Sequence, residues 1–489
     1  MAGRDRFGIK PLVYARTREG CVAASEAKAL WAYGIAARWD REQVFQRLHI
    51  ECDGDATLFE GISQVPPGHM LIATDGETRL LRYWNPPLIE SDQSPPDEVA
   101  AAEMVRELLI DAVRIRLAPD TATATYLSGG LDSSVVTSIA ARHSQTPLNA
   151  YVVSFGSSDF DEASTATSVA RQLGVRPQVV YLDDAKLADH FEATVVQCEQ
   201  VVANGNAVAK FLLSQYAAAQ GTRVVLTGEG ADEIFAGYPS FVADCPDGLS
   251  DDRVSSFSRR DQTFVAASAG MDTSGVREIL GYVPAWIGAA ASKAHLLRPV
   301  LAPALVAEFR DRDPFKVLVQ RVPAPARVDP SDRLAVSMHM WRQTRLPNVI
   351  LSSLGDRAEM AHGLEGRLPF LDHVLAAQVL RLPSALKVKG GVEKYILRSA
   401  FRDLVPAEVV DRRKGPFIAP PPPPSLTSAI KEVLASADHR CVNIIAKDAA
   451  LRLLRDAEAS NRPATRDLLW RCCYTIASLF ILESAYGIS

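Results

Sequence analysis

The sequence predicts an α/β fold built on a doubly wound parallel sheet, preceded by a β-rich domain and followed by a helical extension. Strand-like and helix-like segments alternate between residues 123 and 226, as crossover connections in a parallel sheet require. Two of these strands run straight into glycine turns. The chain has 489 residues, which exceeds one ordinary hydrophobic core, so two or three domains are expected.

Residues 1–85 form the first predicted domain. Short strand-like runs lie at 12–15, 21–24, 70–73 and 80–84, and turn residues separate them. The segment 4–11 is typical of the middle of a domain and not of its beginning. So few strands would leave an apolar face and an unpaired edge. We therefore expect exposed apolar surface, which a second copy of the chain would cover in a homodimer.

Residues 86–98 form a predicted linker, because the segment PPLIESDQSPPDE is rich in proline and acid. The second domain is predicted over residues 99–489 and begins with an amphipathic helix at 99–117. Strands are expected at 123–127, 149–155, 179–182 and 223–226, and helices at 133–142, 164–173, 187–198 and 207–219. The pattern after residue 240 is mostly helical. The proline run at 420–424 indicates a stiff surface loop.

Composition argues against several classes of protein. The formal net charge of −5 provides no global basic field, so we expect no nucleic-acid partner. No apolar run reaches the length of a membrane span, and no apolar stretch follows the charged start, so neither a membrane protein nor a signal peptide is predicted. The seven cysteines include no C-x-x-C pair. They indicate reduced core thiols in a cytoplasmic protein.

The first glycine turn lies in the segment SGGLDSS at 128–134, between a strand and a helix. Glycines let the backbone approach a ligand, and the free N–H groups and dipole of a helix start favour an anion. Ser128, Ser133 and Ser134 add hydroxyl donors. Asp132 would repel a phosphate unless a cation lay between them, which makes it a natural Mg²⁺ ligand. The spacing differs from a Walker motif, so a pyrophosphate site is favoured over a kinase site.

The second turn is TGEGADE at 227–233, again directly after a strand. Its Gly-x-Gly lacks the third glycine of a dinucleotide fingerprint. The carboxylates of Glu229, Asp232 and Glu233 repel one another and become tolerable if they share a divalent cation. Glu233 alternatively caps the helix that follows. Ligands bind at the carboxyl ends of the strands in such a sheet, so both turns should face one cleft.

These motifs resemble the glutamine-dependent asparagine synthetase family of the ATP-pyrophosphatase superfamily, over about residues 4–417. The turn at 128–134 is shared with the wider superfamily. More specific segments are TGEGADEIFAGY at 227–238, LGDRAEMAHGLEGRLPFLD at 354–372 and GGVEKYILR at 390–398. The segments RDRFGIKPL at 4–12, SEAKAL at 25–30 and VPPGH at 65–69 are similar to the end of the family's glutaminase domain, an N-terminal-nucleophile amidotransferase.

The resemblance implies a chemistry that suits two phosphate-binding turns. A substrate carboxylate attacks the α-phosphate of ATP and releases pyrophosphate. Ammonia then attacks the acyl-adenylate, which gives an amide and AMP. The implied cofactors are ATP and Mg²⁺. The implied substrates are aspartate or an analogous small carboxylate, together with ammonia that is free or derived from glutamine.

The resemblance also implies roles for individual residues. Asp132 and Asp232 would hold Mg²⁺, Glu229 would serve the formation and consumption of the adenylate, and Lys394 would neutralise the charge that develops there. The expected nucleotide contacts are Leu127, Ser128, Gly129, Gly130, Asp132, Ser133, Ser134, Val153 at the adenine, Thr227 and Gly228. The expected substrate pocket comprises Tyr238, Asp356, Arg357, Glu365 and Arg367. Two simpler readings stay open, namely a structural Glu365–Arg367 ion pair and an exposed lysine at residue 394.

The start of the chain departs from the family. The glutaminase of the family begins with a cysteine whose thiol attacks glutamine, whereas residue 2 is Ala2 and the first cysteine is Cys21. We therefore expect no glutamine hydrolysis by this chain. Three explanations are a fragment or mis-assigned start, an ammonia-dependent enzyme, and attack by an amine on the substrate itself, as in β-lactam synthetases and lasso-peptide cyclases.

The substrate region departs as well. The segment 198–206 reads CEQVVANGN where the family usually carries an acid-Glu-Pro stretch, and 412–417 reads RRKGPF in place of an Arg-Pro-Lys-like segment. These differences favour a carboxylate other than aspartate, in specialised metabolism. Two other classes are a non-catalytic nucleotide-binding derivative and a tRNA-modifying ATP pyrophosphatase. The intact acids and Lys394 argue against the first, and the acidic balance argues against the second.

Overall fold

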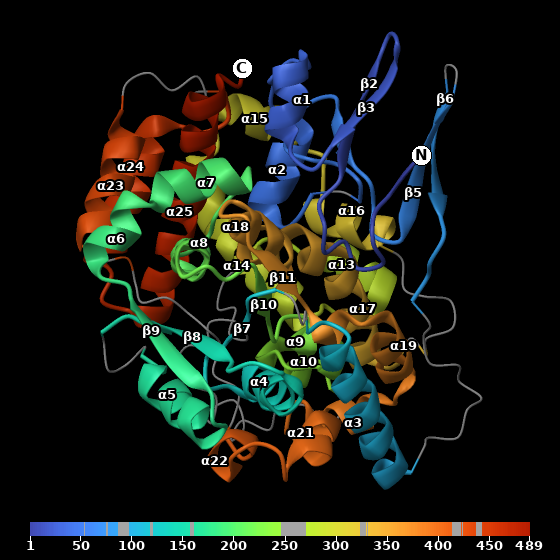
Figure 1. The fold of residues 1–489 in the computed structure, drawn as a ribbon. Helices are drawn as coiled ribbons and strands as arrows, with labels where there is room; N and C mark the ends of the chain where they lie inside the picture. Colours follow the sequence, from blue (N-terminus) through green and yellow to red (C-terminus); the bar gives the residue numbers. More distant parts are fainter. Residues whose placement is uncertain are drawn as a thin grey trace.

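The computed structural model describes the chain except for residues 53, 75–76, 87–96, 118–120, 157–160, 246–269, 323–328, 330, 413–421, 423 and 437–442. Most of the predicted linker, most of the proline run and the segment 413–417 lie outside the described residues. In Figure 1 the first 85 residues pack beside the C-terminal helices, above a central sheet.

The central sheet has five parallel strands in the order β11-β10-β7-β8-β9. Their bounds are β7 Thr123–Tyr126, β8 Asn149–Ser154, β9 Arg176–Tyr181, β10 Val224–Leu226 and β11 Glu365–Arg367. The chain runs outward from β7 to β9 and then returns to place β10 on the other side of β7. The sheet is therefore doubly wound: the order in which successive strands are added reverses between β7 and β10. This confirms the predicted α/β fold.

Helices cover both faces of this sheet (Figure 1). One face carries α3 (Glu98–Arg114), α4 (Leu131–His143) and α5 (Ala163–Gln172), and the other carries α7 (Phe191–Cys198) and α8 (Asn206–Ala219). The single helix predicted at 187–198 is two helices, α6 (Asp184–Asp189) and α7. They separate at His190, whose φ of −109° and ψ of 2° leave the helical region.

The described residues after β10 are mostly helical, as predicted. The elements between β10 and β11 are α9 Ala231–Phe235, α10 Pro239–Ala243, α13 Ser274–Leu280, α14 Ala285–Leu297, η1 Arg298–Val300, α15 Pro303–Glu308, α16 Pro314–Arg321, α17 Arg333–Arg345, the π-helical η2 Leu346–Ile350 and η3 Ser352–Asp356, and α18 Arg357–Met360. Those after β11 are η4 Pro369–Leu371, α19 His373–Arg381, α20 Ser384–Lys387, α21 Tyr395–Phe401, α22 Ala407–Val410, α23 Pro424–Ala435, α24 Lys447–Ala459 and α25 Pro463–Tyr486.

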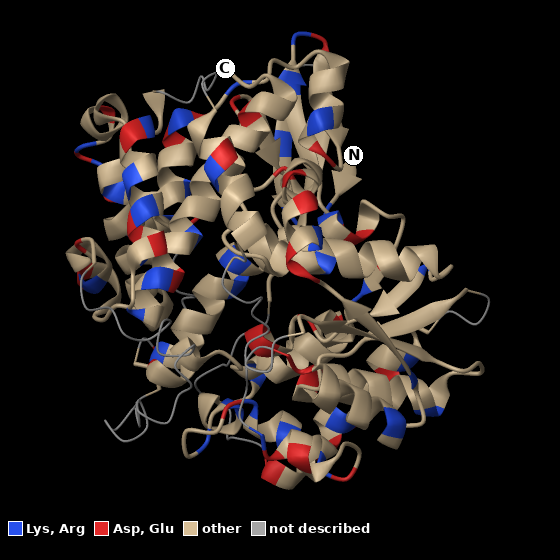
Figure 2. Cartoon of the chain, turned by 90° about the vertical axis from the view of Figure 1, so that its left-hand side faces the viewer, with Lys and Arg blue, Asp and Glu red and all other residues tan. Residues whose placement is uncertain are grey.

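Helix α25 corrects one prediction. Its 24 residues are long and apolar enough to cross a membrane by length and composition, whereas the sequence analysis expected no such run. Yet 78% of the apolar window is buried inside the protein, where α25 packs against α14, α23 and α24. A central core helix is apolar all round for this reason. On the face that Figure 2 presents, basic and acidic residues are intermingled over the surrounding C-terminal helices.

Residues 1–85 contain two small antiparallel sheets, ordered β1-β5-β6 and β3-β2-β4. Their strands are β1 Ala2–Gly3, β2 Val13–Thr17, β3 Gly20–Ala24, β4 Ile62–Gln64, β5 His69–Thr74 and β6 Glu77–Arg82. Helices α1 (Ala27–Tyr33) and α2 (Arg41–His49) were not predicted. The expected exposed apolar surface is present, because Leu81 and Tyr83 are 50% and 42% exposed.

The first domain shares its core with the end of the chain. The rings of Trp31 and Tyr486 lie 4.6 Å apart. The backbone N–H of Trp39 donates to the carbonyl of Ser489 at 3.2 Å, and the N–H of Ser489 donates to Ala37 at 3.1 Å. The C-terminal end of α25 and the residues that follow it are thereby packed against the first domain.

Glu199 fastens the two domains together. It follows α7 in a left-handed conformation with φ of 51° and is 1% exposed. Its carboxylate accepts the backbone N–H groups of Ala27 and Lys28, both at 2.8 Å, and so caps the first turn of α1. The same carboxylate pairs with the Arg357 guanidinium at 2.7 Å. Three distant segments of the chain therefore meet at one buried charge.

Replacement of Glu199 by Gln is expected to destabilise the protein by about 3 kcal/mol at pH 7, because it leaves the buried Arg357 charge without its partner. Burial alone would raise the pKa of Glu199, but the charges of Arg357 and Lys28 outweigh it and hold the pKa below its usual range. The Glu199 contribution is therefore complete above the unfolded pKa of about 4.3 and is lost as the pH falls through the lower folded value.

Thermal unfolding between pH 3 and pH 7 measures this effect. The matched control is Glu26→Gln, which removes a half-exposed partner of Lys28 and should change stability by less than about 1 kcal/mol. Equal unfolding temperatures of the Glu199→Gln variant and the unaltered protein at pH 7 would contradict the assignment.

Candidate active site

The two glycine turns meet where the strand order reverses, between β7 and β10. The first turn joins β7 to α4, and the second joins β10 to α9. A Cβ at Gly228 would lie 2.9 Å from the Ser133 backbone nitrogen and 2.9 Å from Cβ of Asp132. The turns are thus in direct contact, as the prediction that both face one cleft requires. Such a switch point is where ligands bind in doubly wound sheets.

The first turn is held by its own serines. The backbone N–H of Ser128 donates to Oγ of Ser133 at 3.2 Å, and Oγ of Ser133 donates to the Gly130 carbonyl at 3.2 Å. Gly129 has φ of +76°, and a Cβ there would lie 2.9 Å from the Ala166 backbone of α5. The turn is therefore rigid and pressed against a helix, which a preorganised phosphate site requires.

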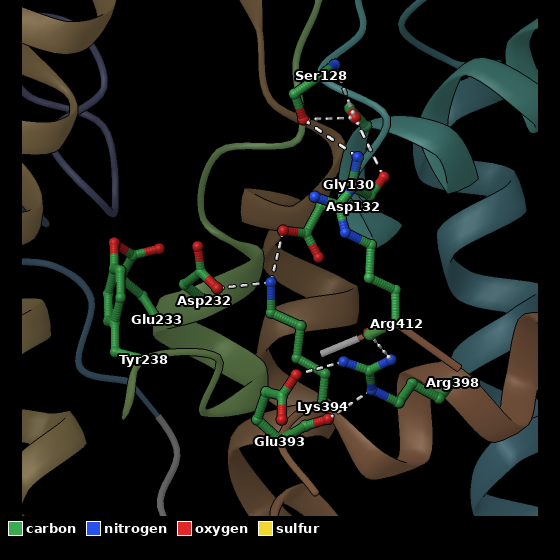
Figure 3. Close-up of polar contacts among 11 residues, drawn as sticks. Ser128, Gly130, Asp132, Asp232, Glu233, Tyr238, Glu393, Lys394, Arg398 and Arg412 are labelled. Atoms are coloured by element: carbon green, nitrogen blue, oxygen red, sulfur yellow. Dashed lines mark hydrogen bonds and ion pairs between the residues drawn. The ribbon is translucent and has the colours of Figure 1, made fainter. Parts of the chain in front are cut away.

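Lys394 joins the two turns (Figure 3). Its ammonium lies 2.5 Å from Oδ2 of Asp132 and 2.5 Å from Oδ1 of Asp232, and its side chain is 1% exposed. The alternative of an exposed lysine is therefore wrong. Lys394 has φ of 55°, the left-handed region that a side chain normally avoids. A Cβ at Gly237 would lie 1.9 Å from Asp232 and 2.1 Å from Lys394, so only glycine leaves room for the pair.

A second ion pair supports this lysine. The guanidinium of Arg398 binds the Glu393 carboxylate and donates to the Glu393 carbonyl at 2.8 Å. It also donates to the carbonyl of Arg412 at 2.9 Å. In Figure 3 the Arg412 side chain extends toward Asp132. The backbone just before Lys394 is thereby fixed from both sides, which stabilises its strained conformation.

Glu229 and Asp232 contact different lysines, Lys210 and Lys394, and a divalent cation shared by the three acids stays a prediction. The Lys210 ammonium lies 2.8 Å from Glu229 and 2.9 Å from Glu359. Oγ1 of Thr227 donates to Glu229 at 3.2 Å. Glu233 does not cap a helix either; the hydroxyl of Tyr238 donates to its carboxylate at 2.6 Å. The acids of the second turn therefore have separate partners.

The expected substrate residues each have partners within the protein, and the pocket that they would form stays a prediction. Asp356 pairs with Lys10 of the first domain at 2.5 Å, and Arg357 pairs with Glu199. Glu365 and Arg367 form an ion pair at 3.0 Å, and Arg367 also donates to the Arg116 carbonyl at 2.8 Å. Asp356 and Arg357 thus lie at the domain junction, and the structural ion pair expected as an alternative is present. Tyr238 packs on Trp341, with ring centroids 4.7 Å apart.

The remaining nucleotide contacts stay predictions. Leu127 is 2% exposed and lies in the core, so any contact it makes comes from its backbone. Ser134 is fully buried at the start of α4. Val153 is half-buried near the carboxyl end of β8, next to β7. This position is consistent with a ring bound beside the first turn.

Sequence reasoning missed Lys210 and Glu359. One signal was present, because Lys210 is the sole charged residue of the apolar helix NAVAKFLLSQYAAA. A single charge on a buried helix usually has a buried partner. The partner could not be identified, since Glu359 lies about 150 residues further along the chain and meets Lys210 only in the folded protein.

Comparison with known proteins now identifies the family. The family model for asparagine synthase matches residues 104–480, and that for the glutamine amidotransferase domain matches residues 1–84. The chain belongs to the asparagine synthase family. This confirms the resemblance, and it implies that the protein uses ATP.

Individual relatives differ in their reported activity. The chain is 30% identical to the amidase chry2 of Gibberella zeae, over all of this chain and 77% of that protein. It is 28% identical to asparagine synthetase 3 of Bacillus subtilis, over 85% of this chain and 64% of that protein. An NMN synthetase structure from Francisella tularensis is 18% identical and covers 29% of this chain and 58% of its own, with a TM-score of 0.21, too low to carry weight.

The chemistry of the site suits a magnesium ion, although no group of three or more His, Cys, Asp or Glu ligands exists among the described residues. Asp132 and Asp232 converge on the Lys394 ammonium, so both carboxylates already point at one cation position. Mg²⁺ in nucleotide sites is commonly bound through one or two carboxylates together with the phosphates of the substrate. Two carboxylates are therefore enough.

Replacement of Gly228 by Ala is expected to weaken Mg·ATP binding by about tenfold or more, because the new Cβ would separate the two turns. Calorimetric titration with Mg·ATP measures this loss. Gly288→Ala is the matched control, since a Cβ at Gly288 of α14 meets nothing within 4 Å. Equal affinities for the two variants would show that contact between the turns is not needed.

Proposed function

We propose that this protein is an ATP-dependent ligase that activates a carboxylate as its acyl-adenylate and transfers nitrogen to it, forming an amide. The observation that carries the proposal is the buried Lys394 ammonium, held by one carboxylate from each turn. A cation fixed between two phosphate-binding turns suits a reaction in which negative charge moves between an α-phosphate and a leaving pyrophosphate. Family membership supports the same chemistry.

In this proposal the first turn binds the phosphates of ATP. Ser128, Gly129 and Gly130 offer backbone N–H groups and hydroxyls at the start of α4, where the helix dipole favours an anion. Asp132 and Asp232 hold Mg²⁺, which would screen the phosphates from the carboxylates when bound. The Lys394 ammonium, which lies between the two aspartates, would neutralise the charge that develops on the α-phosphate and pyrophosphate.

Glu229 is the proposed catalytic carboxylate. It lies on the second turn, with its side chain 24% exposed, and Thr227 and Lys210 fix its orientation. A carboxylate in this place can accept a proton from ammonia as nitrogen attacks the acyl carbon. The products are then an amide and AMP, with the proton carried away on the acid.

The substrate is proposed to be aspartate or another small carboxylate. The Bacillus subtilis relatives named asparagine synthetases support aspartate. The fungal relatives named amidases support a different acid. Glu199 of the divergent 198–206 segment is occupied at the domain junction and so is not available to bind substrate. The nitrogen enters as ammonia, either free or released from glutamine.

The test of the proposed function is exchange of labelled pyrophosphate into ATP with a panel of acids. The panel contains L-aspartate, L-glutamate, a dicarboxylic acid without an amine and an aromatic acid. Exchange that requires Mg²⁺ and one acid is expected. Mg·ATP binding without exchange or AMP formation for any acid would instead favour a non-catalytic nucleotide-binding protein.

Replacement of Lys394 by Met is expected to lower the exchange rate by about 10²–10³-fold, because a preorganised cation is lost at the developing charge. The control is Lys431→Met, which removes an exposed lysine on α23 and should leave exchange unchanged. Thermal unfolding of both variants separates loss of activity from loss of fold. Normal exchange by the folded Lys394→Met variant would refute the role of this lysine.

A further inference from the structure

Lys210 occupies an unusual place in the floor of the site. It extends from the middle of α8 and is buried, with only 9% of its side chain exposed. Its ammonium lies 4.4 Å from the centre of the Tyr126 ring on β7. It pairs with Glu229, which faces the proposed substrate, and with Glu359, which does not. The lysine thus connects a candidate catalytic acid to a second acid behind it.

The Glu359 side chain packs against strand β11 and restricts the residue that the strand can carry at position 366. It belongs to α18, and its side chain is 1% exposed. A Cβ at Gly366 of β11 would lie 1.9 Å from Oε2 of Glu359. The strand β11 can therefore carry only glycine at this position while Glu359 keeps its place. An incidental contact would not need a glycine in an edge strand.

Lys210, Glu229 and Glu359 form a cluster whose charges do not cancel. One ammonium faces two carboxylates, so the group carries a net negative charge. Burial alone would lower the pKa of Lys210, but Glu229 and Glu359 outweigh it and raise that pKa, so the lysine stays charged. Burial raises the pKa of Glu359. Loss of the ammonium would leave two acids close together in a closed site.

Other charged and titratable groups also face the cluster. Tyr126 of β7 lies beside Lys210, and burial raises the pKa of its hydroxyl. Asp356 of η3 acts on Glu359 from the same helical run and is itself paired with Lys10 of the first domain. Gly355 lies next to Glu229, since its Cβ would be 4.0 Å from Oε2 of that residue.

We propose that Lys210 and Glu359 are positioning residues for Glu229: the lysine pairs with Glu229 and holds its carboxylate in one orientation, and Glu359 holds the lysine in place. This inference rests on the proposed function, because it assumes that Glu229 acts on the acyl group. The lysine also makes the floor of the site less negative than the two carboxylates alone would, which favours entry of the polyanionic nucleotide.

Binding of Mg·ATP tests the charge part of the proposal without knowledge of the substrate acid. Lys210→Met leaves two carboxylates without their cation, so its affinity for Mg·ATP at pH 8 should fall by about tenfold. Lys210→Met/Glu359→Gln has the same net charge as the unaltered cluster and should bind Mg·ATP normally. Calorimetry at pH 8 measures both, with Lys431→Met as the control. Normal Mg·ATP affinity of a folded Lys210→Met variant would overturn the proposal.

The rate of amide formation tests the positioning part, because Glu229 is proposed to act when nitrogen attacks the acyl carbon. The double variant keeps Glu229 and a well-packed neighbourhood but lacks the group that orients Glu229. It should fold and bind Mg·ATP normally, while its rate of amide formation from ammonia and L-aspartate, or the acid selected from the panel, falls by about tenfold or more. Lys210→Arg, which keeps the charge, should retain more activity. If Lys210→Met fails to fold, the double variant decides the matter.

The outcomes separate this inference from the function on which it rests. An unaltered protein that binds no Mg·ATP would refute the proposed function, and the inference with it. Strong loss of amide formation in Glu229→Gln together with normal amide formation in Lys210→Met/Glu359→Gln would keep the proposed function and overturn the inference. Slow amide formation and normal Mg·ATP binding in the double variant would support both.

Discussion

The candidate site depends on one buried ammonium between two carboxylates. Lys394 draws Asp132 and Asp232 to a common point, although they come from different turns of the sheet. Without this charge the two aspartates would repel each other across the switch point. The structure stabilises the lysine in a strained conformation through the Arg398–Glu393 ion pair. Contact between the turns, and with it the proposed phosphate site, follows from that arrangement.

Much of the fold could be predicted from local pattern. The strands β7, β8, β9 and β10 are largely apolar runs followed by turn residues, so their presence and parallel direction follow from alternation with helices. The strand β11 could not be predicted, because Glu-Gly-Arg has no strand-like pattern and pairs only because β10 offers a free edge. Helices α1 and α2 were missed for a similar reason. The first is capped by Glu199, a residue about 170 positions away.

The turns could be predicted, but the partners of their acids could not. Glycine and serine between a strand and a helix have a local meaning, and the contact between the turns follows from the sheet. The partner that each acid takes depends on Lys210, Lys394 and Tyr238, which come from three separate segments of the chain. Asp356 and Arg357 have family-like surroundings in sequence, yet their charges are used at the domain junction. A buried charge takes the partner that the fold brings close.

Two glycines reveal how the acids are divided. Gly237 leaves room for the pair of Asp232 and Lys394, and Gly366 leaves room for Glu359, each with 1.9 Å between a hypothetical Cβ and a carboxylate oxygen. Each set of acids thus has its own buried lysine and its own glycine. In the proposed reaction the first set faces the phosphates and the second faces the acyl carbon. Because the two lysines are separate, Lys394 can neutralise charge on the nucleotide while Lys210 holds Glu229 in place.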